Sequence, residues 1–119
     1  MAAHRDFWRG RRVLVTGHTG FKGAWLSLWL HALGAEVAGV SYGEPSTPSL
    51  HALARVGELV AGIEADVRDA HAMRRAVQQA QPELLVHLAA QPLVRRARAD
   101  PRHTYEVNVL GTVNVLEAA

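Results

Sequence analysis

Three glycines spaced three residues apart follow an apolar run in segment 13–23, Val-Leu-Val-Thr-Gly-His-Thr-Gly-Phe-Lys-Gly. Backbone N–H groups at the start of a helix can bind a phosphate when the turn before them is rich in glycine. Gly17 suits a tight turn, Gly20 lets phosphates approach the backbone, and Gly23 lets the next helix lie close to the strand. The spacing predicts a cradle for the pyrophosphate of a dinucleotide, and a glycine-rich turn without a ligand is the alternative.

The elements that must position this turn alternate along the whole chain. Strands are expected at 13–15, 36–41, 59–64 and 84–88, and helices at 22–33, 49–56, 69–81 and 100–119. In the first helix an apolar stripe is expected to pack on the sheet and to place two tryptophans in the core; it consists of Trp25, Leu26, Trp29, Leu30 and Leu33. Asp69 and Asp100 are the predicted N-caps of the later helices, and a basic loop precedes Asp100.

This order predicts an α/β fold, a Rossmann-type doubly wound parallel sheet with strand order 3-2-1-4. Residues 1–119 are expected to form the N-terminal part of a single NAD(P)-binding domain, without its second half or a substrate-binding part. The fourth strand would then be an unpaired apolar edge, so we expect the isolated piece to be poorly soluble or only partly folded. The ligand crevice should open between strands 1 and 4.

Composition indicates an ordinary globular chain, with 49% hydrophobic residues, 20% charged residues and a formal net charge of +2. The arginines fall in two separate groups, near 9–12 and 95–102, which argues against nucleic acid as a partner. The absence of cysteine excludes disulfides and thiolate catalysis, and no metal site is predicted. Neither a signal peptide nor a membrane segment is recognised, so a cytoplasmic protein without a membrane partner is expected.

Together, segment 13–23, Asp66-Val67-Arg68-Asp69 and His87-Leu88-Ala89-Ala90-Gln91 resemble the N-terminal part of the extended short-chain dehydrogenases/reductases, the NAD-dependent epimerase/dehydratase family. Within that family, segments 48–50, 89–95 and 104–112 are most similar to the CDP-glucose 4,6-dehydratases. The Gly-His-Thr-Gly-Phe-Lys-Gly form of the glycine loop discriminates best.

The resemblance implies a lyase for deoxysugar and polysaccharide biosynthesis that converts CDP-glucose to CDP-4-dehydro-6-deoxyglucose. In that family NAD takes a hydride from C4 of the sugar, a base removes the C5 proton, water leaves from C6, and the hydride returns to C6. The resemblance also implies a nucleotide-sugar partner and a homodimer of the full-length protein. Another extended epimerase or reductase acting on a nucleotide sugar, and a non-catalytic nucleotide-binding module, are the alternatives.

The resemblance assigns cofactor-binding roles to residues that follow the predicted strands. The pyrophosphate group consists of Gly17, Thr19, Gly20, Phe21, Lys22 and Gly23. Asp66 and Val67 are assigned to adenine, and the ribose of the nicotinamide is assigned to Leu88, Ala89, Ala90 and Asn108.

Other roles remain open for several of these side chains. Lys22 could equally be a solvated cation, Asp66 a helix cap, and Asn108 a structural amide of the last helix. His18 is expected to shape the loop or lie at the surface, and His87 to be a packed core histidine rather than a catalytic one.

The sequence departs from the family pattern in three places. Ser41, a candidate cofactor contact, stands where NAD-dependent relatives often have an aspartate, so NAD is expected and NADP is left open. Pro92-Leu93 replaces a Ser-His pair, and the substrate contacts proposed instead are Gln91, Arg95 and Arg96. Neither Tyr42 nor Tyr105 begins a Tyr-x-x-x-Lys pair, so we predict no catalytic residue in this chain and no activity of this piece alone.

Overall fold

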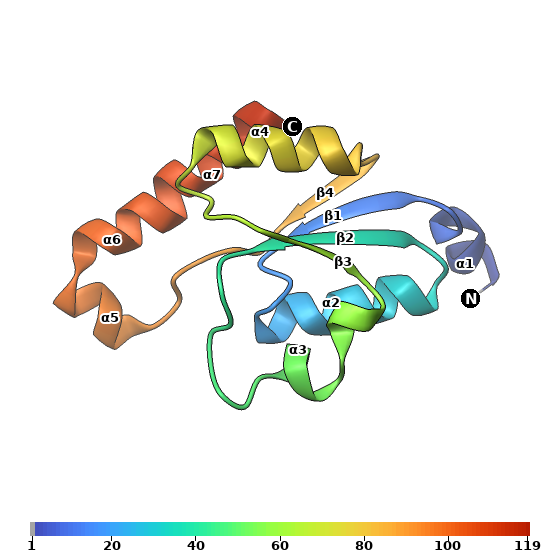
Figure 1. Ribbon diagram of the computed structural model, residues 1–119, viewed down its shortest axis with the longest axis horizontal. Helices are drawn as coiled ribbons and strands as arrows, with labels where there is room; N and C mark the ends of the chain where they lie inside the picture. Colours follow the sequence, from blue (N-terminus) through green and yellow to red (C-terminus); the bar gives the residue numbers. More distant parts are fainter. Residues whose placement is uncertain (1) are drawn as a thin grey trace.

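The computed structural model describes residues 2–119, which form one four-stranded parallel sheet with helices on both faces (Figure 1). The strands are β1 (Arg12–Thr16), β2 (Glu36–Ser41), β3 (Ala61–Glu64) and β4 (Leu84–His87). Their order is β3-β2-β1-β4, and every neighbouring pair is parallel. The predicted fold class and strand order are confirmed.

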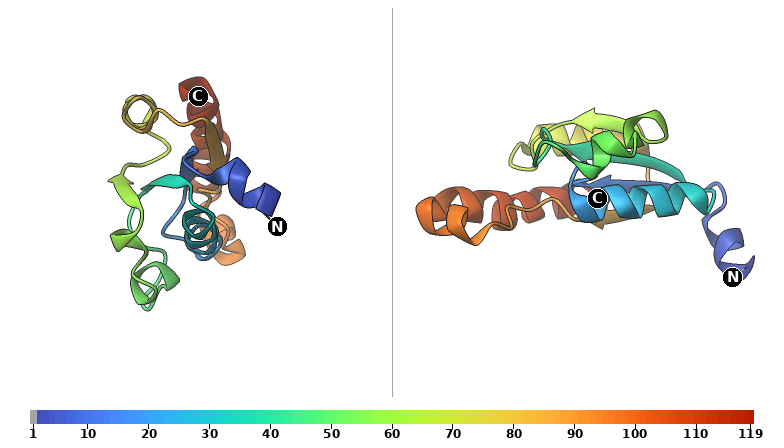
Figure 2. Two further views of the ribbon diagram at one scale, coloured as in Figure 1. Left: turned by 90° about the vertical axis from the view of Figure 1, so that its right-hand side faces the viewer. Right: turned by 90° about the horizontal axis from the view of Figure 1, so that it is seen from below.

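The helices lie on the two faces and at the two ends of this sheet. They are α1 (Ala2–Trp8), α2 (Phe21–Ala32), α3 (Leu50–Leu53), the 3₁₀ helix η1 (Val56–Glu58), α4 (Ala70–Ala80), α5 (Val94–Ala99), α6 (Pro101–Tyr105), the π-helical segment η2 (Glu106–Leu110) and α7 (Gly111–Ala118). Figure 1 shows α2 and α3 on one face and α4 and α7 on the other. Helices α1 and α5 lie at opposite ends of the molecule (Figure 2).

Alternation along β1 divides the core into two layers. Val13 and Val15 pack with Leu30 of α2 on one face, whereas Leu14 packs with Met73 of α4 on the other. All three β1 residues are almost completely buried, as expected for a central strand of a parallel sheet covered on both faces. The carboxyl end of β1 is therefore held rigidly where the glycine loop begins.

The predicted apolar stripe of α2 is right for Leu30, which lies in the core, and wrong for the two tryptophans. Trp25 and Trp29 are 56% and 66% exposed, and the side of α2 that faces the sheet carries small residues, including Ala24 and Ser27. Ser27 is completely buried, and its hydroxyl has a partner there because it donates to the carbonyl of Gly23, 2.7 Å away. Small side chains bring the helix axis close to the sheet, and the two tryptophans lie on the outer side of α2 while Leu30 packs against β1.

Four other parts of the chain differ from the expectation. Helix α1 has no counterpart among the predicted elements, and the predicted basic loop before Asp100 instead contains helix α5. The predicted last helix begins as expected with Asp100 as N-cap and Pro101 at the first position, but it contains the π segment η2. The expected helix 49–56 is two short pieces, α3 and η1. No helix among residues 2–119 is long and apolar enough to cross a bilayer.

Candidate functional site

The glycine loop between β1 and α2 has the geometry of a phosphate cradle. Gly17 has φ +76°, and a Cβ at this position would lie 2.8 Å from the backbone nitrogen of Ala89. A Cβ on Gly23 would overlap the carbonyl oxygen of Gly17. Both positions therefore require glycine, one for a left-handed turn beside β4 and one for the close approach of α2.

The first turn of α2 leaves its backbone N–H groups available to an anion. Gly20 is the N-cap of this helix, and it has no side chain that could accept from those N–H groups. The positive end of the helix dipole lies at the same point, which favours a phosphate there. This cradle fits the pyrophosphate of NAD, and Phe21, Lys22 and Gly23 are the residues whose N–H groups would bind it. The side chain of Lys22 is exposed.

Thr19 joins the glycine loop to the end of β2. Its hydroxyl lies 2.6 Å from the hydroxyl of Ser41 and donates to the carbonyl of Gly43 at 2.8 Å. Because that bond uses the hydroxyl proton of Thr19, Ser41 is the donor in the bond between the two side chains. Ser41 therefore helps to fix the loop at the position where NAD-dependent relatives often carry an aspartate.

Asp66 lies two residues beyond β3, and its carboxylate is bound by Arg68. The Arg68 guanidinium donates to it at 2.6–3.1 Å, and the Arg68 backbone N–H donates at 2.9 Å. These hydrogen bonds, chiefly those from the Arg68 side chain, hold the pKa of Asp66 below its ordinary value. The helix-cap alternative for Asp66 is wrong, since Asp69 caps α4 by accepting from the Ala72 N–H at 3.0 Å. Val67 is buried beside it, and its carbonyl accepts from Asn114.

A directed chain of hydrogen bonds holds the end of β4 against β1 and α7. The hydroxyl of Thr16 accepts from the N–H groups of Leu88 and Ala89, at 3.0 and 3.1 Å, and lies 2.6 Å from Nδ1 of His87. On the other side of the ring, Nε2 lies 3.0 Å from the Thr112 hydroxyl.

The direction of these bonds fixes the tautomer of His87. The hydroxyl proton of Thr112 goes to the Asn108 carbonyl at 2.6 Å, so Thr112 must accept from His87 Nε2–H. Nδ1 of His87 then accepts from Thr16. Burial lowers the pKa of His87, which agrees with this neutral form. The arrangement gives His87 the structural role expected of a packed histidine.

Asn108, on η2, clamps the loop that follows β4. Its Oδ1 accepts from the Gln91 N–H at 2.7 Å, and its Nδ2 donates to the Gln91 carbonyl at 3.2 Å. The Gln91 side chain is buried and bonds to the backbone of Leu93 and to the hydroxyl of Thr104. Asn108 is thus a structural amide, and Gln91 uses its amide to shape the loop.

Most of the predicted cofactor residues therefore meet at the carboxyl ends of the four strands, where ligands bind in sheets of this kind. Arg95 and Arg96 are apart from this group, exposed on α5 at one end of the molecule (Figure 1). Sequence reasoning missed Thr16, Thr112 and the buried position of His18. Thr16 could have been recognised in the sequence because it ends an otherwise aliphatic strand. A hydroxyl buried at that position needs hydrogen-bond partners.

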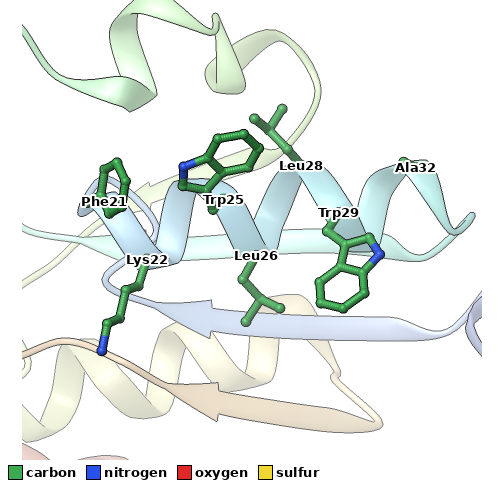
Figure 3. Close-up of a pocket in the computed structure, with 7 residues that line it drawn as sticks. All are labelled: Phe21, Lys22, Trp25, Leu26, Leu28, Trp29 and Ala32. Carbon is green, nitrogen blue, oxygen red and sulfur yellow. The ribbon is translucent and has the colours of Figure 1, made fainter.

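A shallow pocket on the outer side of α2 is a separate feature (Figure 3). Its lining residues all come from this one helix: Phe21, Lys22, Trp25, Leu26, Leu28, Trp29 and Ala32. Apart from Lys22 the side chains are apolar, so the pocket lacks the polar partners that a nucleotide requires.

Comparisons with known proteins agree with this geometry. Residues 14–119 match the family model described as GDP-mannose 4,6 dehydratase. The CDP-glucose 4,6-dehydratase of Salmonella typhimurium is 48% identical over 113 residues, which cover 95% of this chain and 32% of that protein. The dTDP-glucose 4,6-dehydratase of Shigella flexneri is 37% identical over 91% of this chain and 30% of its own length.

Solved structures give the same picture of the fold. The UDP-glucose 4-epimerase of Thermus thermophilus in complex with NAD superposes with a TM-score of 0.77 and 36% identity, over 90% of this chain and 33% of that one. The chain thus spans about a third of the length of the relatives it matches. Since the family model matches nearly the whole chain, the chain belongs to the GDP-mannose 4,6-dehydratase family, within the extended short-chain dehydrogenases/reductases.

Proposed function

We propose that these residues are the cofactor-binding part of an NAD-dependent nucleotide-sugar 4,6-dehydratase whose substrate is CDP-glucose. The glycine loop carries the cofactor half of this proposal, because two of its glycines leave no room for a Cβ and the first turn of α2 has no side-chain cap. The choice of CDP-glucose rests on the 48% identity to the Salmonella typhimurium enzyme, compared with 37% to the dTDP-glucose 4,6-dehydratase.

In this proposal each strand end has a defined task. The N–H groups at the start of α2 bind the pyrophosphate, and the carboxylate of Asp66 accepts from the adenine amino group while Arg68 keeps it ionised. Leu88, Ala89 and Ala90 border the nicotinamide ribose directly after β4, where Thr16 holds the backbone of the first two in place. Bound NAD supplies a reversible hydride acceptor for the sugar. NAD is favoured over NADP because no arginine follows Ser41 before Arg55 to hold a 2′-phosphate.

The acid and base groups of the reaction are proposed to come from residues outside 1–119. Neither tyrosine of this chain is followed four positions later by lysine. Both ring nitrogens of His87 are already hydrogen-bonded, one to Thr16 and the other to Thr112. We therefore propose that residues 1–119 alone do not turn over substrate. Arg95 and Arg96 remain the proposed contacts for the diphosphate or the hexose, with Gln91 positioning the loop that leads to them.

The full-length protein is also proposed to form a homodimer through its last helix. This helical segment runs through α6, η2 and α7, and its exposed apolar side chains are Tyr105, Val109, Leu110, Val113 and Leu116. Several exposed apolar side chains along one helical segment are typical of an interaction surface. Sedimentation of the complete protein tests this point, with a dimer expected and a monomer at micromolar concentration contradicting it.

The substrate assignment is tested by giving the complete protein CDP-glucose, dTDP-glucose, GDP-mannose and UDP-glucose in parallel. The alkali-induced absorbance of a 4-keto sugar is expected with CDP-glucose at the highest kcat/KM. A 4-epimerised UDP-sugar without any 4-keto product would instead support an epimerase, the alternative favoured by the 38% identity to a UDP-glucose 4-epimerase of Mycolicibacterium smegmatis. The absence of product from CDP-glucose would end the assignment.

A further inference from the structure

Two histidines from distant parts of the chain meet beside the glycine loop. His18 lies within the loop and is only 4% exposed, and its ring packs edge-to-face against the ring of His51 in α3. The ring centroids are 5.3 Å apart, with an interplanar angle of 81°. The side chain of His18 therefore holds the loop down on the sheet, which corrects the expectation that it could lie at the surface.

Glycines in β2 and β3 form the floor under the His18 ring. A Cβ on Gly39 would overlap this ring, and one on Gly62 would lie 3.5 Å from its Nε2. Both strands thus leave space for the imidazole, and the ring is confined between them and His51. Because His18 follows Gly17 directly, a displacement of the ring would displace the phosphate-binding turn.

The position of His51 is set by a carboxylate in the loop between β2 and α3. Nδ1 of His51 lies 2.8 Å from Oε1 of Glu44, and the Ser49 hydroxyl donates to Oε2 of Glu44 at 2.9 Å. Ser49 also caps α3 by accepting from the Ala52 N–H at 3.1 Å. The hydrogen bond from His51 and, to a smaller extent, the one from Ser49 lower the pKa of Glu44. The carboxylate therefore stays ionised and anchors His51.

We propose that His51 is a positioning residue for the dinucleotide site: anchored by Glu44, it fixes the ring of His18 and thereby the loop that binds the pyrophosphate. This inference rests on the proposed NAD-binding function and adds a residue from α3 to it. Nothing in the glycine motif alone points to His51, because 33 positions separate the two histidines in the sequence.

The charge state of the pair gives the proposal a pH dependence. The titratable groups that face one another here are His18, His51 and Glu44, whereas β2, β3 and η1 contribute the glycines Gly39, Gly62 and Gly57. Burial, followed by repulsion from His51, holds the pKa of His18 below its ordinary value. His18 is therefore neutral at pH 7, and acid that charges it places a buried cation against His51 and loosens the loop.

The test is the affinity of the complete protein for NAD between pH 5.5 and 8, measured by titration calorimetry on four proteins. Compared with wild type, His51→Ala should weaken binding about fivefold to tenfold at pH 7.5. His51→Asn keeps an N–H that can donate to Glu44, so it should regain most of the affinity that His51→Ala loses. His71→Asn, at an exposed histidine of α4 on the other face of the sheet, is the matched control and should behave as wild type.

The outcomes separate this inference from the function on which it rests. Wild-type affinity and an unchanged pH profile in His51→Ala would overturn the positioning role while leaving NAD binding in place. If His51→Ala fails to fold, the same measurement on Glu44→Ala decides, because this variant removes the anchor of His51 and keeps both histidines, so wild-type NAD affinity in it overturns the proposal. Wild-type protein that binds no NAD at any pH would remove the proposed function, and the inference with it.

Discussion

The carbonyl oxygen of Gly17 occupies the space that a Cβ of Gly23 would need. The turn at the end of β1 and the first turn of α2 are therefore in direct backbone contact. Any side chain at position 23 must push the helix away from the loop, and the N–H groups that it offers to a phosphate move with it.

Gly23→Ala should consequently weaken NAD binding by at least tenfold in the complete protein and also lower its Tm. Gly57→Ala is the matched control, because a Cβ there meets only His51 atoms at 3.8–4.0 Å, an ordinary contact distance. Titration calorimetry and thermal unfolding of both variants provide the comparison. Wild-type affinity in Gly23→Ala would show that the close approach of α2 is irrelevant to the cofactor.

Asp66→Ala tests the adenine contact. Loss of a charge-assisted hydrogen bond is expected to weaken NAD binding about tenfold. Arg68→Ala is the partner measurement, since it removes the ion pair but leaves the carboxylate, and it should cost less than the loss of Asp66 itself. Unchanged NAD affinity in Asp66→Ala would refute the adenine role, and equal losses in both variants would assign the effect to the ion pair.

Thr16→Val tests the hydroxyl that holds the end of β4. The substitution keeps the shape of the side chain but leaves the N–H of Ala89 and Nδ1 of His87 without their partner, whereas the N–H of Leu88 keeps its second bond, to the Thr16 carbonyl at 3.1 Å. We expect the free energy of unfolding to fall by about 2–3 kcal/mol, measured by urea denaturation. Thr47→Val, at an exposed position, should change it by less than about 0.5 kcal/mol, and a similarly small effect at Thr16 would contradict the account.

Stability should also decrease in mild acid because of His87. Burial lowers its pKa in the folded state, so its contribution is complete above the unfolded value of about 6.5 and is lost as the pH falls through the folded value. Urea unfolding of the complete protein between pH 7.5 and 5.5 should show this loss. His87→Asn cannot take the charge and should flatten the profile, whereas the exposed control His31→Asn should not. A profile in His87→Asn as steep as that of wild type would exclude His87 as the source.

The isolated 119-residue chain provides a separate test of the edge of the sheet. β4 pairs only with β1 within residues 2–119, and its residues are half-buried. An apolar edge strand of this kind favours aggregation, so we expect poor solubility or a broad thermal transition. A sharp cooperative melt of the monomeric chain would contradict this prediction.

The sequence predicted the strand order and the roles of Gly17 and Gly23 because both depend on local rules, the alternation of elements and the conformations open to glycine. It failed where the outcome depends on tertiary packing. The apolar pattern of α2 places Leu30 in the core correctly, but Gly23, Ala24 and Ser27 take the positions closest to the sheet, so Trp25 and Trp29 are exposed. The burial of His18 depends on Gly39 and Gly62, which lie on strands far away in the sequence.

The position of NAD in a crystal structure of the complete protein tests the central claim most directly. The account predicts that the pyrophosphate accepts hydrogen bonds from the N–H groups of the first turn of α2, and that the adenine amino group donates to Asp66. NAD bound elsewhere, such as in the apolar pocket on the outer side of α2, or an adenine that does not contact Asp66 or Val67, would contradict it.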